Sequence, residues 1–94
     1  MDFLLRLLKA LANETRIEIV QLLIKSGQLS LNEIATEINR PYKTVAGHLK
    51  TLEKAGLLKS QRFKGETLYS LNTSVNLEYN RQLIGLIKKR MPHK

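Results

Sequence analysis

The middle of the chain constrains the fold more than any other part, because it contains two closely spaced helix boundaries. Ser30 and Glu33 form a capping box, in which each side chain accepts a hydrogen bond from the backbone N–H of the other residue. The helix that begins there ends just before Asn39, which tolerates the left-handed conformation of a helix end. Pro41 suits the first turn of the next helix. Two helices joined by about three residues predict a helix-turn-helix, here over residues 30–55.

The helix that follows Pro41 has two faces of opposite character. At about 100° per residue, its apolar side chains and its lysines fall on opposite sides. The apolar side holds Val45, Leu49, Leu52 and Gly56. The opposite side holds Lys43, Gly47, Lys50 and Lys54. We expect the apolar side to face the core and the lysine side to face outward, as in a recognition helix in the DNA major groove.

Gly47 interrupts the lysine side of this helix. A glycine in a helix interior costs about 1 kcal/mol relative to alanine. One interpretation is that the helix backbone comes close to DNA at this position. The other is a neutral substitution on an exposed face, and the sequence leaves both open.

Two further helices precede the capping box. Asp2 can cap a first helix, and Asn13 can cap a second helix that ends at Gly27. In the first helix, apolar residues cover too much of the circumference for one buried stripe: Phe3, Leu4, Leu5, Leu7, Leu8 and Leu11. Such a helix has more than one neighbour. The second neighbour is either another copy of the chain or the last helix of the same chain.

The hydrophobic period changes after the recognition helix. Residues 57–63 and 67–72 alternate in part and flank a turn at residues 64–66, which predicts a β-hairpin. A hairpin in this place is a wing, with Arg62 and Lys64 at or near its tip. These two cations either contact phosphates or form an ordinary basic turn.

A last helix is predicted over residues 74–91, capped by Thr73 or Ser74 and ended by Pro92. The elements together predict one domain over residues 1–94. Its fold class is α+β and mostly helical, a winged helix-turn-helix with a two-stranded β-hairpin wing over residues 57–72 and a C-terminal helix.

The net charge of +8 is spread unevenly along the chain. Residues 1–39 carry four basic and five acidic groups, whereas residues 40–64 carry seven basic groups and one acidic group. Residues 79–94 add five basic groups and no acidic group. This distribution favours a polyanionic partner. The alternative is a solvated basic surface.

Composition narrows the function further. The 94 residues include no Cys, so a disulfide framework and a thiolate metal site are excluded, and a reducing cytoplasm fits. The apolar stretch over residues 3–12 is too short to span a membrane and contains Arg6 and Lys9. The chain has no Gly-rich phosphate loop and no His pair with an acidic partner at ligand spacing, so we expect neither an enzyme nor a cofactor.

Three stretches resemble the arsenic-repressor-like (ArsR-type) winged-helix regulators. They are LKALANETRIEIVQLL, LSLNEIATEINRPYKTVAGHLKTLEKAGLL and LYSLN, which extend from Leu8 to Asn72. The resemblance implies a winged-helix fold, a homodimer and transcriptional repression. It also implies that the first and last helices, residues 1–12 and 74–91, form the dimer interface, which fits the excess apolar surface of the first helix.

The chain departs from this family in two respects. The third helix has no Cys pair, and the last helix has Glu78 but no His before His93, so the family's familiar metal sites are missing from the sequence. Many members carry Ser and Arg where this chain has Ala46 and Gly47. Gly47 cannot read guanine with two hydrogen bonds as an arginine does, so base reading rests on other groups or is weak.

We therefore predict two sets of site residues. The expected DNA-binding residues are Arg40, Tyr42, Lys43, Thr44, Gly47, Lys50, Lys54, Arg62 and Lys64. The expected dimerisation residues are Phe3, Leu4, Leu7, Leu8, Leu83, Ile84 and Ile87. Tyr42 either meets base edges or packs on the third helix. For His48 we favour a structural or phosphate-contacting role over a pH switch or a metal ligand.

The sequence thus predicts a cytoplasmic regulator of transcription, most simply a homodimeric repressor that binds a pseudo-palindromic site in double-stranded DNA. Two alternatives remain open. One is a winged-helix module that binds another protein. The other is an architectural DNA binder with weak sequence preference. Nothing in the sequence identifies an effector.

Overall fold

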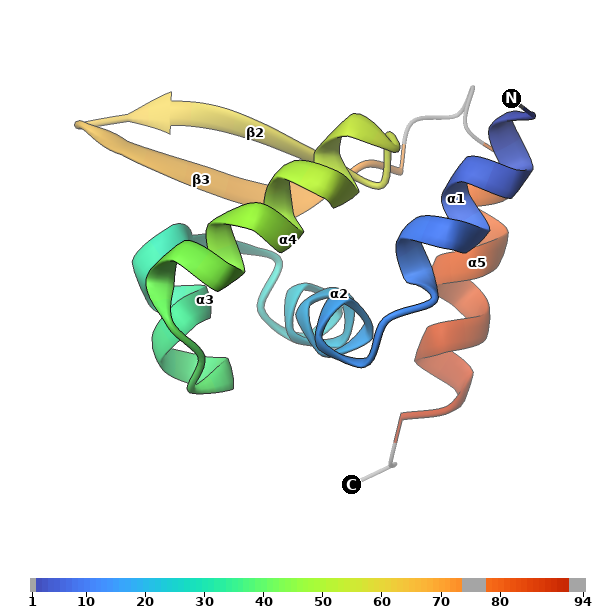
Figure 1. Ribbon diagram of the computed structural model, residues 1–94, viewed down its shortest axis with the longest axis horizontal. Helices are drawn as coiled ribbons and strands as arrows, with labels where there is room; N and C mark the ends of the chain where they lie inside the picture. The colour runs from blue at the N-terminus through green and yellow to red at the C-terminus, as the bar shows by residue number, and fades with distance from the viewer. Residues whose placement is uncertain (1, 74–77, 92–94) are drawn as a thin grey trace.

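Three local capping interactions set the starts of the first three helices in the computed structural model, which describes residues 2–73 and 78–91 (Figure 1). Helix α1 spans Phe3–Leu11, and the Asp2 carboxylate accepts from the Leu4 N–H at its start. Helix α2 spans Glu14–Ser26, and Asn13 accepts from the Arg16 N–H. Helix α3 spans Leu31–Ile38 and begins with the predicted capping box. The three predicted caps are confirmed.

The helix-turn-helix is formed by α3 and by helix α4, which spans Tyr42–Lys54. Asn39 ends α3 in the left-handed conformation with φ 54°, as expected for an Asn at this position. Pro41 stands just before the first residue of α4. The predicted turn between the two helices is therefore confirmed.

The wing consists of strand β2 over Leu58–Phe63 and strand β3 over Glu66–Leu71, paired antiparallel. Lys64 and Gly65 both have positive φ, at 50° and 81°. Two such residues form the tight turn whose twist suits a hairpin. The turn is shorter than the sequence predicts, because Glu66 already belongs to β3.

A third strand enlarges the predicted two-stranded sheet. Strand β1 spans Gln28–Ser30 between α2 and α3 and pairs antiparallel with β3, which gives the order β1-β3-β2. Leu29 is the partner of Tyr69 in this pairing. A strand of three residues is too short for a visible period-2 pattern, which explains why the sequence did not predict it.

The core lies where α1, α2 and α4 meet the base of the wing. Its most deeply buried side chains belong to Leu7, Ile19, Val20, Leu23, Ile34, Val45, Leu49, Leu52, Leu57 and Leu58. Full burial of one such side chain contributes about 1.5–3 kcal/mol. The three apolar residues predicted for the inner face of α4 are all fully buried, so its orientation is confirmed.

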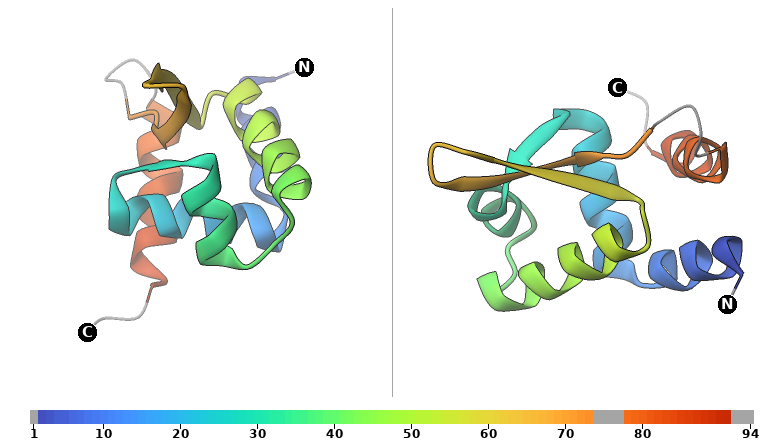
Figure 2. Two further views of the ribbon diagram at one scale, coloured as in Figure 1. Left: turned by 90° about the vertical axis from the view of Figure 1, so that its left-hand side faces the viewer. Right: turned by 90° about the horizontal axis from the view of Figure 1, so that it is seen from above.

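Helix α5 spans Glu78–Lys89 and packs against α2. The predicted start of this helix at Ser74 and its predicted stop at Pro92 lie outside the described residues. Helices α1 and α5 lie at one end of the molecule, and the wing tip lies at the other (Figure 2). Within the described residues no helix has the length and apolar content needed to cross a membrane.

Candidate nucleic-acid interface

The outer face of α4 carries the predicted lysine stripe, which we define as Lys43, Lys50 and Lys54 with Gly47 between them. All four residues are exposed, while Val45, Leu49 and Leu52 on the opposite face are fully buried. A Cβ atom built on Gly47 meets no other atom within 4 Å. Internal packing therefore does not require a glycine here, and the stripe presents a bare stretch of helix backbone between its cations.

The first turn of α4 adds two exposed side chains to this face. Tyr42 is 52% exposed, and Thr44 is exposed as well. Tyr42 also lines a small hollow of about 130 Å³ together with Ser30 at the start of α3 and Arg62 on the wing. The structure thus brings the first turn of the recognition helix and the wing tip to one place, although they are about twenty residues apart in sequence.

The two predicted cations of the wing tip each contact a neighbouring side chain on the hairpin. The Arg62 Nη1 donates to Thr67 Oγ1 at 3.3 Å. The Lys64 Nζ lies 5.4 Å from the centroid of the Phe63 ring, which is 54% exposed. An exposed contact of this kind contributes about 0.5–1 kcal/mol. Phe63 is an exposed aromatic residue at the wing tip that the sequence prediction did not include.

A hydrogen bond to Glu53 joins the end of α4 to the wing. Ser60 Oγ on β2 donates to Glu53 Oε2 at 2.6 Å. Burial raises the pKa of the Tyr69 hydroxyl on β3, and the Glu53 carboxylate and Tyr42 raise that pKa further. Tyr69 therefore stays neutral at ordinary pH.

Arg40 in the turn already has an ionic partner. Its Nη2 lies 3.4 Å from Glu18 Oε1, and the two side chains are 43% and 38% exposed. Such a surface pair contributes about 0–1 kcal/mol. A phosphate can therefore displace Glu18 from Arg40 at little cost, but Arg40 does not present a free cation in the way that the lysine stripe does.

His48 is hydrogen-bonded to Arg16, a residue that the sequence prediction did not single out. The Arg16 Nε donates to His48 Nδ1 at 3.1 Å, and the Arg16 Nη1 donates to the Ala10 carbonyl oxygen at 3.3 Å. Burial lowers the pKa of His48, and the nearby Arg16 charge lowers it further. His48 is thus a neutral hydrogen-bond acceptor that joins α4 to α2.

Asn80 connects α5 to the recognition helix and to the wing. It is fully buried, and its Nδ2 donates to the carbonyl oxygens of Gly56, after α4, and Asn72, after β3. Asn72 Nδ2 also donates to the Gly56 carbonyl at 3.2 Å. The signal in the sequence is a polar residue in line with Ile84 and Ile87 on the apolar side of α5.

The apolar surface at the α1 and α5 end differs in detail from the predicted dimerisation set. Leu7 is fully buried and Ile84 is 9% exposed, so both already pack within their own chain. The large exposed apolar side chains of this end are Leu5, Leu8, Tyr79 and Leu86. Four residues of the predicted dimerisation set are partly buried: Phe3, Leu4, Leu83 and Ile87. The predicted dimerisation set includes Leu7 because the apolar residues of α1 extend over more than one face of the helix.

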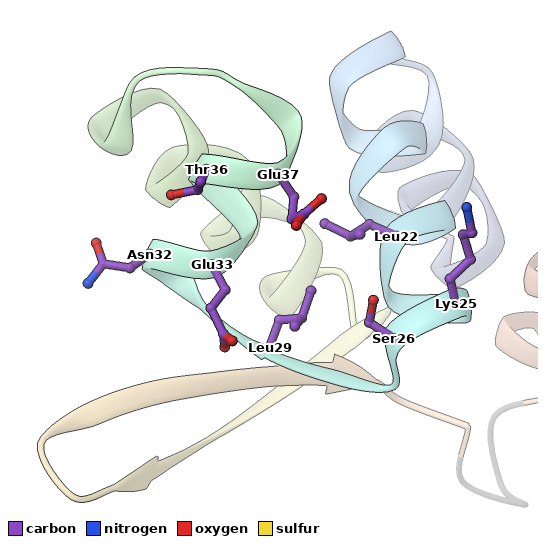
Figure 3. Close-up of a pocket in the computed structure, with 8 residues that line it drawn as sticks. All are labelled: Leu22, Lys25, Ser26, Leu29, Asn32, Glu33, Thr36 and Glu37. Atoms are coloured by element: carbon purple, nitrogen blue, oxygen red, sulfur yellow. The ribbon is translucent and has the colours of Figure 1, made fainter.

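A larger hollow lies away from the lysine stripe. It has a volume of about 460 Å³ and lies between α2 and α3 (Figure 3). Leu22 and Leu29 contribute apolar surface to it, and Lys25, Glu33 and Glu37 contribute opposite charges. The Glu33 carboxylate is occupied by the capping box. Within residues 2–73 and 78–91, no three His, Cys, Asp or Glu side chains come close enough together to hold a metal ion.

Comparisons with known proteins agree with this geometry. Residues 11–61 match the family described as Helix-turn-helix domain. The chain is 33% identical over 82 residues to the transcriptional repressor SdpR of Bacillus subtilis, which covers 86% of this chain and 89% of SdpR. It is 38% identical over 64 residues to the arsenical resistance operon repressor of Escherichia coli, which covers 66% of this chain and 55% of that protein.

A solved structure gives the same result. The homodimeric winged helix-turn-helix domain Mb0332 of Mycobacterium bovis, a possible ArsR-family transcriptional regulator, superposes with a TM-score of 0.80. It is 27% identical, and the alignment covers 99% of this chain and 85% of that one. The chain spans only 16% and 61% of two archaeal helix-turn-helix regulators that it also matches. The chain belongs to the helix-turn-helix family and, within it, to the ArsR-type winged-helix transcriptional regulators.

Proposed function

We propose that the protein is a homodimeric transcriptional repressor that binds a pseudo-palindromic site in double-stranded DNA. The observation that carries this proposal is the lysine stripe, an exposed row of cations opposite a fully buried apolar face. A cationic helix face beside a basic wing suits the major groove and its flanking phosphates. The two repressors named above, which are similar to this chain in sequence, support the same function.

The proposed contacts divide into two groups. Thr44 and Tyr42, in the first turn of α4, face base edges, as the first turn of a recognition helix does. The phosphate contacts come from the stripe lysines, from the wing cations Arg62 and Lys64, and from Arg40 once it leaves Glu18. Such contacts position the protein on DNA without reading sequence.

A second copy of the chain completes the site. The exposed apolar residues Leu5, Leu8 and Leu86 lie at the end that holds α1 and α5, and burial against a twin surface removes them from water. A two-fold axis there places two recognition helices about 34 Å apart, one turn of B-DNA. A regulator of this kind acts where the DNA is, so we assign it to the cytoplasm.

The test is a fluorescence-anisotropy titration of duplex DNA over a series of salt concentrations. One probe carries the sequence upstream of the protein's own gene, and the other carries a scrambled version. We expect a steep loss of affinity with salt and a clear preference for the upstream probe. The variant Lys43→Gln/Lys50→Gln should lose most of this binding. The control Lys25→Gln/Lys88→Gln removes the same charge from exposed sites off the stripe and should retain it.

The other outcomes identify the two alternatives. Steep salt dependence with equal affinity for the two probes supports an architectural DNA binder, for which the lack of an arginine at Gly47 is the favouring observation. No binding of either probe at low salt contradicts the DNA proposal. It then favours a module that binds another protein through its exposed apolar end.

A further inference from the structure

A second basic region lies beyond the end of the lysine stripe. It is a hollow of about 420 Å³ between α1, the start of α2 and the last turns of α4. Its lining residues are Arg6, Lys9, Ala10, Arg16, Thr51, Lys54 and Ala55. We call it the basic hollow. Four of its seven residues are cations and none is acidic, so its lining carries a net positive charge.

The cations of the basic hollow have no acidic partners. Within residues 2–73 and 78–91 the ion pairs are Arg40–Glu18 and Arg81–Glu78, and neither uses a residue of the hollow. Cations around one hollow repel one another, and an anion among them replaces this repulsion by attraction. The hollow therefore favours a negatively charged occupant.

Arg16 is already oriented for such an occupant. Its Nε and Nη1 donate to His48 and to the Ala10 carbonyl, which fixes the guanidinium plane. A guanidinium has five N–H groups, so about three remain for a ligand after these two bonds. The flat fork of an arginine fits the paired oxygens of a phosphate or a carboxylate. Cations from three different helices suit a tetrahedral phosphate better than a planar carboxylate, because its oxygens point in several directions.

The basic hollow is continuous with the proposed DNA surface. Lys54 is the last cation of the lysine stripe and also lines the hollow. Helices α4 and α1 lie along the same edge of the molecule when it is viewed from above (Figure 2, right). Residues of both helices line the basic hollow. A polyanion that follows the stripe therefore reaches Arg6 and Lys9 on α1.

We propose that the basic hollow is a phosphate-binding site that extends beyond the recognition helix and the wing onto α1 and α2 and shares only Lys54 with the lysine stripe. The phosphate comes either from the DNA backbone, towards the centre of the site, or from a free phosphorylated small molecule. The first source rests on the proposed DNA-binding function, and the second does not. In both cases Arg6, Lys9, Arg16 and Lys54 supply the donors.

The test uses the variant Arg6→Gln/Lys9→Gln, which alters two exposed side chains and leaves the Arg16 hydrogen bonds in place. The matched control is again Lys25→Gln/Lys88→Gln, with the same change of charge at exposed sites outside the hollow. Circular dichroism and sedimentation verify that each variant keeps the fold and the oligomeric state of the parent.

Two measurements distinguish the sources. In the DNA arm, the slope of log affinity against log salt becomes shallower by about 0.9 for each DNA phosphate that the variant no longer neutralises, and the control keeps the parent slope. In the second arm, the DNA-free protein is titrated with inorganic phosphate and with pyrophosphate at constant ionic strength and pH. We follow the NMR chemical shifts of the Ala10 and Ala55 amides and of the Arg16 Nε–H. Saturable changes that are abolished in Arg6→Gln/Lys9→Gln identify a free anion.

Either result supports a phosphate-binding site in the basic hollow and identifies the source of the phosphate. A parent-like salt slope in Arg6→Gln/Lys9→Gln, together with no saturable phosphate shifts, overturns the inference. If Lys43→Gln/Lys50→Gln still abolishes DNA binding in that case, the proposed function stands and only the basic hollow fails. If the parent protein binds no DNA but shows the phosphate shifts, the proposed function fails and the basic hollow stands as a site for a free anion.

Discussion

The Arg16 Nε donates to the His48 Nδ1 across 3.1 Å, which joins the second helix to the recognition helix. This bond requires neutral His48 with its proton on Nε2, because a protonated imidazole has no acceptor. Protonation replaces the bond by repulsion between two cations. We therefore expect the stability of the recognition helix to depend on pH through His48.

The first prediction is that stability decreases below neutral pH through His48. Burial and Arg16 hold its folded-state pKa below the ordinary value of 6.5. As the pH falls, the unfolded chain therefore takes up the proton first, which favours unfolding. The contribution of His48 is complete above pH 6.5 and is lost as the pH falls through the folded-state pKa. Urea denaturation at intervals from pH 7.5 to 5 measures this loss.

The variant His48→Asn isolates this effect. Asn places an Oδ1 acceptor at the same number of bonds from Cβ as Nδ1 and does not titrate. It should flatten the pH profile relative to the parent, because His48 no longer titrates. His48→Ala removes the acceptor and should cost about 1 kcal/mol at pH 7.5. A His48→Asn profile as steep as the parent profile assigns the pH dependence to other groups.

The second prediction concerns Gly47 and the two interpretations that the sequence left open. Gly47→Ala should stabilise the free protein by about 1 kcal/mol, because the new Cβ meets no atom and alanine favours the helix. If the helix backbone approaches DNA closely, the same change weakens operator binding. Gly85→Ala on α5 is the matched control, because its Cβ also meets no atom. Equal operator affinity of the parent and Gly47→Ala favours neutral substitution.

The sequence could predict those parts of the fold that depend on neighbouring residues. The capping box at Ser30, the left-handed Asn39 and the inner face of α4 each follow from residues within a few positions of one another, and all are present. Strand β1 was missed because its pairing with β3 joins residues about forty positions apart, such as Leu29 and Tyr69.

The same limit applies to the candidate site. The exposure of the lysine stripe follows from helical periodicity, and it was predicted correctly. The Arg16–His48 bond and the partners of Asn80 depend on how helices pack; the local pattern marks Asn80 as a polar residue on an apolar face but does not identify its partners. Leu7 was assigned to the dimer surface because the apolar pattern of α1 does not indicate which leucines its own chain covers.

The third prediction is that Asn80 contributes strongly to stability although it is not part of the lysine stripe. Asn80→Ala removes the donor to the Asn72 carbonyl oxygen and one of the two donors to the Gly56 carbonyl oxygen, and it empties a fully buried site. Each buried group that loses its partner costs about 1–3 kcal/mol. Urea denaturation should therefore show a loss of about 2 kcal/mol or more. Asn32→Ala, an exposed asparagine on α3, should lose under about 0.5 kcal/mol. A similar small loss at Asn80 contradicts its role as a connector.

The fourth prediction concerns which leucines face a second copy of the chain. Leu8 on α1 is 46% exposed and Leu86 on α5 is 59% exposed, so both have surface that a partner can cover. Leu8→Gln should weaken the dimer by about 1 kcal/mol or more, roughly fivefold in Kd, because the polar amide is desolvated in the interface. Sedimentation equilibrium measures this Kd, and Leu86→Gln should behave in the same way.

Phe63→Gln is the control for this experiment. It also replaces an exposed apolar side chain by a polar one, since Phe63 is 54% exposed. The wing tip lies at the opposite end of the molecule from α1 and α5, so this change should leave the dimer Kd unchanged. Leu7→Ala should instead lower the stability of the fold by about 2–5 kcal/mol, because Leu7 is buried in its own chain. A dimer that is insensitive to both Leu8→Gln and Leu86→Gln places the two-fold axis away from α1 and α5. The recognition helices would then be spaced differently from one turn of DNA.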